Sequence, residues 1–144
     1  MTSDPEISHT GRSSATTAAL QRFRVLMWVG IAANVILAVI SIIWTDAVLN
    51  VLHIEIAQPL VWPRFGAFLL ILLSIFYVPA AIDPFYHRYS AIVAIICRFG
   101  GFAFFTIVGG RYIIFGLFDL IFGLPQAVLL LFAWKYSQCG GTAR

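Results

Sequence analysis

Charged side chains are what this 144-residue sequence has least of. Asp, Glu, Lys and Arg make up only 10% of the chain, whereas 61% of the residues are hydrophobic. Soluble domains carry roughly 25% charged residues, and a water-soluble fold needs a polar exterior that this chain cannot supply. The few basic residues are dispersed and form no stripe, which excludes a nucleic-acid-binding domain.

Histidine and cysteine are also scarce, and their positions exclude several kinds of site. The three histidines, His9, His53 and His87, all lie outside the long apolar runs, so a haem held between two helical histidines is not expected. Cys97 and Cys139 form no C-x-x-C motif, so we expect neither a disulfide framework nor a metal site. No serine or cysteine has a base near it in sequence, and we expect the chain to have no catalytic activity of its own.

Four long apolar runs dominate the rest of the chain. One membrane crossing needs about 20 apolar residues, and runs of about this length cover 25–44, 65–82, 90–109 and 112–134. Runs of this length form helices in lipid, and the alternating segments of a membrane β-barrel are absent. The sequence therefore predicts an all-α, four-helix antiparallel bundle that spans a membrane.

The segments outside the runs predict the rest of the organisation. We expect a disordered arm over 1–22, a transmembrane domain over 23–136 and a short tail over 137–144. Between the first two runs, Val48, Val51, Leu52 and the segment 54–56 favour a short helix at the membrane surface. Asp83 and Pro84 predict a tight turn between the second and third runs.

Basic residues near the ends of the runs predict the orientation. With the N-terminus inside, the inner side carries Arg12, Arg22, Arg24, Arg88, Lys135 and Arg144, and the outer side carries Arg64 and Arg111. Lys and Arg concentrate on the cytoplasmic side of membrane proteins. We therefore expect both termini in the cytoplasm, in a membrane of the bacterial inner (plasma) membrane type.

Two charged residues interrupt the third and fourth runs. Arg98 lies about 12 Å from the inner end of its run and Asp119 about 10 Å from the outer end of the next, at about 1.5 Å per residue. A charge at the bilayer centre is costly, so the two opposite charges are expected to face each other. The pair is either purely architectural or part of a ligand site.

Glycines and phenylalanines surround this predicted pair. Gly116 and Gly123 share the helix stripe of Asp119, and Gly101 shares that of Arg98, so these glycines are candidates for close helix packing. A Phe-rich pocket beside the pair would suit a quinone or a lipid. Its candidate residues are Phe102, Phe105, Phe115, Phe118 and Phe122, together with Arg64 at the outer boundary.

With four helices placed, the chain resembles small bacterial inner-membrane proteins of the DoxX-like kind. The resemblance covers roughly residues 25–134 and rests on the long first outer connection and on the phrase Pro63-Arg64-Phe65-Gly66. Some members of that kind are subunits of quinone-linked oxidoreductases. No catalytic residue carries over, because Arg98 and Asp119 do not correspond to a known active site of that kind.

These observations favour a small accessory subunit that packs against a larger membrane complex, respiratory or redox, or against copies of itself. The alternative is a quinone- or lipid-binding protein that uses the Arg98–Asp119 pair and the Phe-rich pocket. A third reading is a small oligomeric transporter. The expected partners are membrane lipid and membrane protein, and the only bound molecule expected is a quinone or lipid.

Overall fold

Helices make up almost all of the structure, a computed structural model that describes the backbone of residues 6–54 and 59–139 and the side chains of 17–54 and 59–135. No β-strand occurs in those ranges. The elements in order are α1 (Glu6–Ile43), α2 (Thr45–Val51), α3 (Val61–Ile82), α4 (Arg88–Val108), the short 3₁₀ turn η1 (Gly110–Tyr112) and α5 (Ile113–Cys139).

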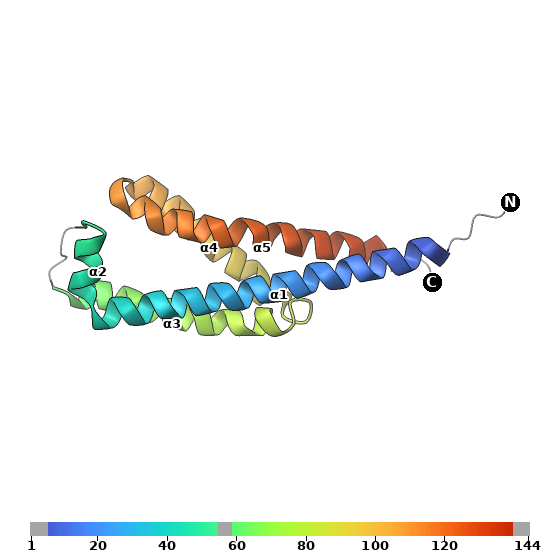
Figure 1. Ribbon diagram of the computed structural model, residues 1–144, viewed down its shortest axis with the longest axis horizontal. Coiled ribbons are helices and arrows are strands. Elements are labelled where there is room, and N and C mark those ends of the chain that lie inside the picture. Colours follow the sequence, from blue (N-terminus) through green and yellow to red (C-terminus); the bar gives the residue numbers. More distant parts are fainter. Residues whose placement is uncertain (1–5, 55–58, 140–144) are drawn as a thin grey trace.

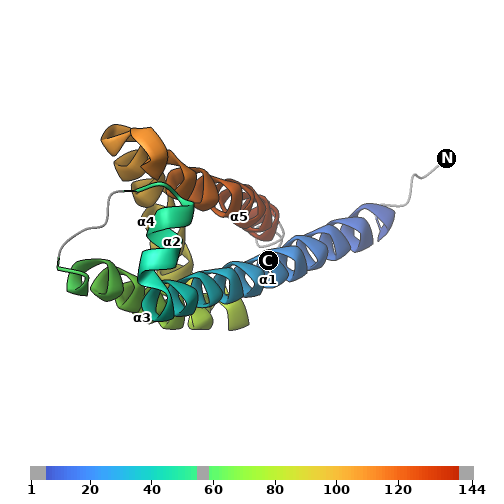
Figure 2. The same ribbon diagram turned by 60° about the vertical axis from the view of Figure 1, so that its left-hand side comes forward.

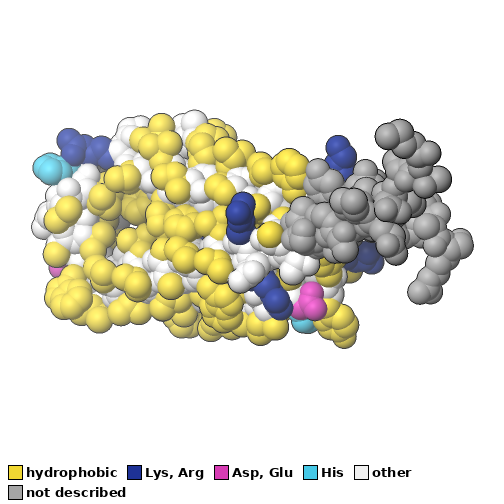
Figure 3. All heavy atoms as spheres, turned by 45° about the vertical axis from the view of Figure 1, so that its right-hand side comes forward, with side chains coloured by type: hydrophobic (Ala, Val, Ile, Leu, Met, Phe, Trp, Pro, Cys, Tyr) yellow, Lys and Arg dark blue, Asp and Glu magenta, His cyan; other side chains and the backbone are white. Residues whose placement is uncertain are grey.

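Four of the helices are long and apolar enough to cross a membrane. The apolar stretches are Thr17–Ile43, Val61–Ile82, Arg88–Val108 and Gly110–Lys135, which confirms the four predicted spans and a helical integral membrane architecture. Hydrophobic side chains cover most of the face seen in Figure 3, and charged side chains lie mainly nearer its two ends. Such a surface is suited to lipid rather than to water.

The first helix is longer than the sequence analysis predicted. A disordered arm was expected over 1–22, but α1 begins at Glu6 and continues without a break into the first span. A helix already formed by an apolar span extends cheaply, because each further residue adds a hydrogen bond without a new nucleation step. Residues 1–5 and 140–144, which include most of the predicted tail, lie outside the described residues.

The helices are arranged as two pairs joined by α1. Helix α1 packs along α3, α4 packs along α5, and α1 also contacts α5. Helices α3 and α4 follow each other in the chain but contact each other much less. Figures 1 and 2 show the two pairs diverging toward the end at which α2 lies.

The opposite end of the bundle, where α1 begins, is closed by an apolar core. Phe23 and Met27 of α1 and Leu130 of α5 are buried there. Alanines surround them on the other helices, at 80, 81, 91 and 94. Small side chains let helix backbones approach closely, so the bundle is tightest at this end.

The chain reverses at the α2 end through one long connection, which contains α2, and one short connection between α4 and α5. Helix α2 corresponds to the predicted surface helix but ends at Val51, before Ile54, and the remaining predicted residues Glu55 and Ile56 lie outside the described ranges. Between α4 and α5, Gly109 and Gly110 take φ values of 71° and 60°. Only glycine adopts such values without strain, which allows the short link between two long helices.

Asp83 forms the predicted turn between α3 and α4. Its Oδ1 accepts hydrogen bonds from the backbone N–H groups of Phe85 (3.0 Å) and Tyr86 (3.1 Å). The Arg24 guanidinium donates to the carbonyl oxygen of Ile82 just before the turn, which ties α1 to the end of α3. The N–H group of Tyr86, followed by that of Phe85, holds the pKa of the Asp83 carboxyl below its usual value.

Replacing Asp83 by alanine should therefore lower the melting temperature of the detergent-solubilised protein by several degrees. The alanine side chain offers no acceptor to the two turn N–H groups. Because the folded-state pKa is lowered, the turn's contribution is present at neutral pH and is lost as the pH falls through that value. Asp83→Asn is the matched control, since its amide oxygen can still accept, and a melting temperature as low as that of Asp83→Ala would contradict this role.

Candidate functional site

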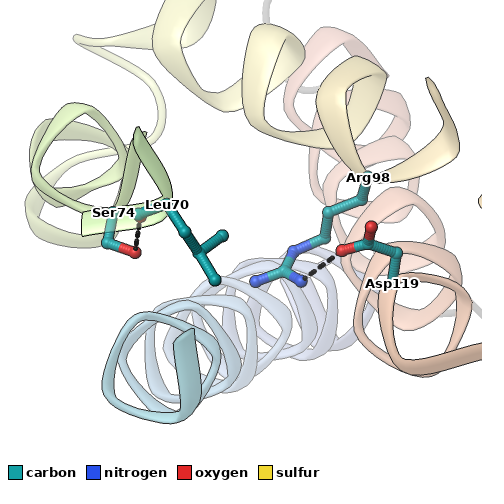
Figure 4. Close-up of polar contacts among 4 residues, drawn as sticks. All are labelled: Leu70, Ser74, Arg98 and Asp119. Atoms are coloured by element: carbon teal, nitrogen blue, oxygen red, sulfur yellow. Dashed lines mark hydrogen bonds and ion pairs between the residues drawn. The ribbon is translucent and has the colours of Figure 1, made fainter. Parts of the chain in front are cut away.

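Arg98 of α4 and Asp119 of α5 lie together in the middle of the bundle. The Arg98 Nη1 is 3.4 Å from the Asp119 Oδ1, and Figure 4 shows both side chains directed inward from neighbouring helices. Arg98 is 2% exposed and Asp119 is 23% exposed. The pair expected from the sequence is therefore present, as a single long contact that leaves most of the guanidinium to other neighbours.

Three other helix positions enclose the Arg98 guanidinium. Its Cζ lies 5.1 Å from the ring centre of Phe122 on α5 and 5.8 Å from that of Tyr77 on α3, both within the range of cation–π attraction. On α1, a Cβ added to Gly30 would lie 2.7 Å from Nη2. Glycine at 30 is thus what lets the guanidinium rest against the backbone of α1.

The glycines predicted for helix packing all lie at the contact between α4 and α5. A Cβ on Gly116 would lie 3.2 Å from the backbone oxygen of Phe102, and a Cβ on Gly123 would lie 3.1 Å from the Cβ of Arg98. A Cβ on Gly101 would overlap the carboxylate of Asp119. These three positions therefore set how closely α4 and α5 approach and where the carboxylate sits.

Two amide side chains near the pair were missed by the sequence analysis as site residues. Asn34 of α1 is 3% exposed and Gln126 of α5 is 0% exposed. Within the described part of the chain, Asn34 Oδ1, Arg98 Nε and both polar atoms of Gln126 have no hydrogen-bond partner. The available signal was an amide deep inside an apolar run, since buried polar groups are costly unless they are bonded.

A cavity of about 430 Å³ adjoins the pair on the side of α2. It lies between the two helix pairs, and apolar residues of all five helices form most of its wall. Asp119 and Asn34, which lie within the apolar stretches of α5 and α1, also line it. The remaining polar side chains in its wall, Ser41, Thr45 and Tyr112, lie nearer the α2 end.

Three of the six predicted pocket residues line this cavity, namely Phe105, Phe115 and Phe118. The other three do not, and helix phase explains why. Phe122 packs against the Arg98 guanidinium, and Phe102 presents its backbone to Gly116. Arg64 donates from Nε to the Thr45 hydroxyl at 3.2 Å instead of reaching the cavity.

Among the described residues, no group of three His, Cys, Asp or Glu side chains is placed to hold a metal ion. Comparison with models of protein families, with curated proteins and with solved structures finds no match. The resemblance to DoxX-like proteins therefore stays a prediction.

Substituting Gly101 should break the Arg98–Asp119 contact without touching either charge. A methyl group at 101 would occupy the space of the Asp119 carboxylate, so Gly101→Ala should lower the melting temperature by several degrees. Gly100→Ala is the matched control, because a Cβ at that neighbouring position meets nothing within 4 Å. Equal melting temperatures for the two variants would contradict the packing role of Gly101.

Removing the Asp119 charge should destabilise the protein more than removing both charges. Asp119→Asn leaves a buried, unpaired guanidinium, and breaking a buried pair in this way costs about 3–5 kcal/mol. Adding Arg98→Met removes that charge while keeping an unbranched side chain, so the double variant should recover most of the loss. Denaturation of the wild type, the two single variants and the double variant measures this coupling, and a double variant no more stable than Asp119→Asn would refute it.

Proposed function

We propose that this protein binds a small, mainly apolar ligand of the quinone or lipid kind in the cavity beside Arg98 and Asp119. The observation that carries the proposal is the cavity itself. Its volume of about 430 Å³ falls in the range of roughly 300–1,000 Å³ that is typical of ligand pockets. Apolar walls with a few convergent polar groups are also the usual composition of such pockets.

The polar end of the proposed site is the Asp119 carboxylate rather than the guanidinium. Both members of the pair were predicted as candidates for a ligand site, but Arg98 is not among the residues that line the cavity. Asp119 lines the cavity and contacts Arg98 at the same time. Arg98 lies outside the cavity wall, where it neutralises the Asp119 carboxylate and fixes its position.

The two other functional readings remain predictions. An accessory subunit would use the exposed apolar helix faces, which lipid covers equally well. A transporter would need a path to both membrane faces, and the apolar core of Phe23, Met27 and Leu130 closes the end of the bundle opposite the cavity. The cavity supports a binding role more directly than it supports either of these.

We also propose that the protein lies in a bacterial inner membrane with both termini in the cytoplasm. The start of α1 and the end of α5 lie at one end of the bundle (Figure 1), as four crossings require. That end carries the larger set of basic residues, which includes Arg22, Arg24 and Lys135. The cavity and α2 then lie toward the outer side.

Filling the cavity tests the binding proposal. Gly66 lines the cavity, and a Cβ there meets nothing within 4 Å, so a phenylalanine fits at 66 without displacing the backbone and adds a ring at the cavity wall. We expect wild-type protein purified in mild detergent to retain a small apolar molecule in native mass spectrometry, and Gly66→Phe to have lost it. Gly100→Phe is the matched control, because Gly100 is equally exposed and open but lies outside the cavity wall.

The same spectra separate the functional readings. A ligand retained by wild type and by Gly100→Phe but lost in Gly66→Phe supports the cavity as its site. Stoichiometric partner chains without any retained small molecule would instead favour the accessory subunit. Equal retention by the two phenylalanine variants would place the ligand elsewhere and contradict the proposal.

A further inference from the structure

The polar groups in the cavity wall restrict which head group a ligand can present. At mid-membrane, the wall offers the Asp119 carboxylate and the Asn34 side chain. An ionised carboxylate only accepts hydrogen bonds. Asn34 Oδ1 is a buried acceptor without a partner in the described part of the chain, and the N–H groups of the same amide can donate. A head group that lies against the Asp119 carboxylate must therefore donate a hydrogen bond, and the Asn34 amide can accept from it or donate to it.

The hydroxyl of Thr45, nearer the α2 end, is already occupied. It donates to the Ser41 carbonyl oxygen at 2.7 Å and accepts from Arg64 Nε at 3.2 Å. The Thr45 hydroxyl therefore already has its hydrogen-bond partners within the chain. Ser41 and Tyr112 also lie nearer the α2 end, so Asp119 and Asn34 are the polar groups that a head group meets at the Arg98 end of the cavity.

Charge excludes two classes of ligand. An anionic head group would face the Asp119 carboxylate, and the nearest buried cation, Arg98, lies outside the cavity wall behind that carboxylate. A cationic head group would stand beside a carboxylate that Arg98 already neutralises. Unpaired or like charges in a site of low dielectric are strongly unfavourable, so a head group that lies against Asp119 must be neutral.

A second, wholly apolar groove continues from the cavity toward the lipid-facing side. It has a volume of about 540 Å³ and lies between α1, α2 and α5. It shares five wall residues with the cavity, namely Leu37, Val48, Leu52, Phe115 and Phe118. An apolar tail can follow this groove while the head group stays at Asp119.

We infer that the ligand is a neutral, largely apolar molecule with a hydroxyl head group, either a phenol or an alcohol. The hydroxyl donates to Asp119 or Asn34, and the tail lies along the apolar groove. This inference rests on the proposed binding function and narrows it, because it excludes fatty acids and other anionic amphiphiles as occupants of the cavity.

Three probes of nearly equal shape test the head-group chemistry. They are para-octylphenol, its methyl ether and para-octylbenzoate, titrated against the purified full-length protein in detergent with binding followed by tryptophan fluorescence. The phenol should bind about tenfold more tightly than the ether, because one hydrogen bond to a charged group contributes about that much. The benzoate should bind more weakly still.

The outcomes separate this inference from the proposed function. Equal affinities for phenol and ether, or tighter binding of the benzoate, would leave a ligand-binding cavity but overturn the hydroxyl assignment. Absence of saturable binding for all three probes, with the same result for Gly66→Phe, would overturn the binding function and the inference with it.

A variant series assigns the acceptors. Asn34→Leu and the Arg98→Met/Asp119→Asn double variant should each reduce the preference for phenol over ether, because each removes or weakens an acceptor in the wall. Thr106→Val is the matched control, since it removes a hydroxyl that is exposed, bonded to the Phe102 carbonyl and absent from the cavity wall. A preference for phenol unchanged in both acceptor variants would overturn the assignment.

Discussion

The burial of the Arg98 guanidinium is the constraint on which the arrangement of the bundle depends. A charge removed from water must be paired or enclosed by polarisable groups, and here three helices besides its own contribute. Helix α5 supplies a carboxylate and an aromatic ring, α3 supplies the ring of Tyr77, and α1 supplies the gap at Gly30. The pair therefore fixes the rotation of four helices about their axes, whatever it contributes to net stability.

The cavity follows from a gradient in side-chain size along the bundle. Alanines at 80, 81, 91 and 94 bring the helices together at the end where α1 begins. At the α2 end, Phe105, Phe115 and Phe118 stand between the helix pairs. Small residues allow close backbone contact, and large rings hold backbones apart, so the two pairs diverge and leave a space whose inner limit is the Arg98–Asp119 contact.

The sequence was sufficient to predict the features that depend on a single helix or on one large free-energy cost. Run length gave the four spans, and the cost of buried charge paired Arg98 with Asp119. It was harder to predict which side of each helix faces the cavity. Phe102 and Phe122 were therefore predicted as pocket residues, although they pack elsewhere. Gly30, Tyr77 and Asn34 were missed because their importance comes from contacts between helices far apart in sequence, and a single polar or small residue in an apolar run gives only a weak signal.

The site and the stability of the fold are coupled through one residue. Asp119 neutralises Arg98 on one side and faces the cavity on the other. Nearby, Asn34 Oδ1 is buried without a partner, which costs roughly 1–3 kcal/mol in the folded state. A ligand that donates a hydrogen bond there offsets this cost, and because it binds only the folded state it also stabilises the bundle. Of the residues with such unpartnered buried atoms in the described part of the chain, Asn34 lines the cavity, whereas Arg98 and Gln126 lie outside its wall, so a ligand in the cavity can relieve this cost only at Asn34.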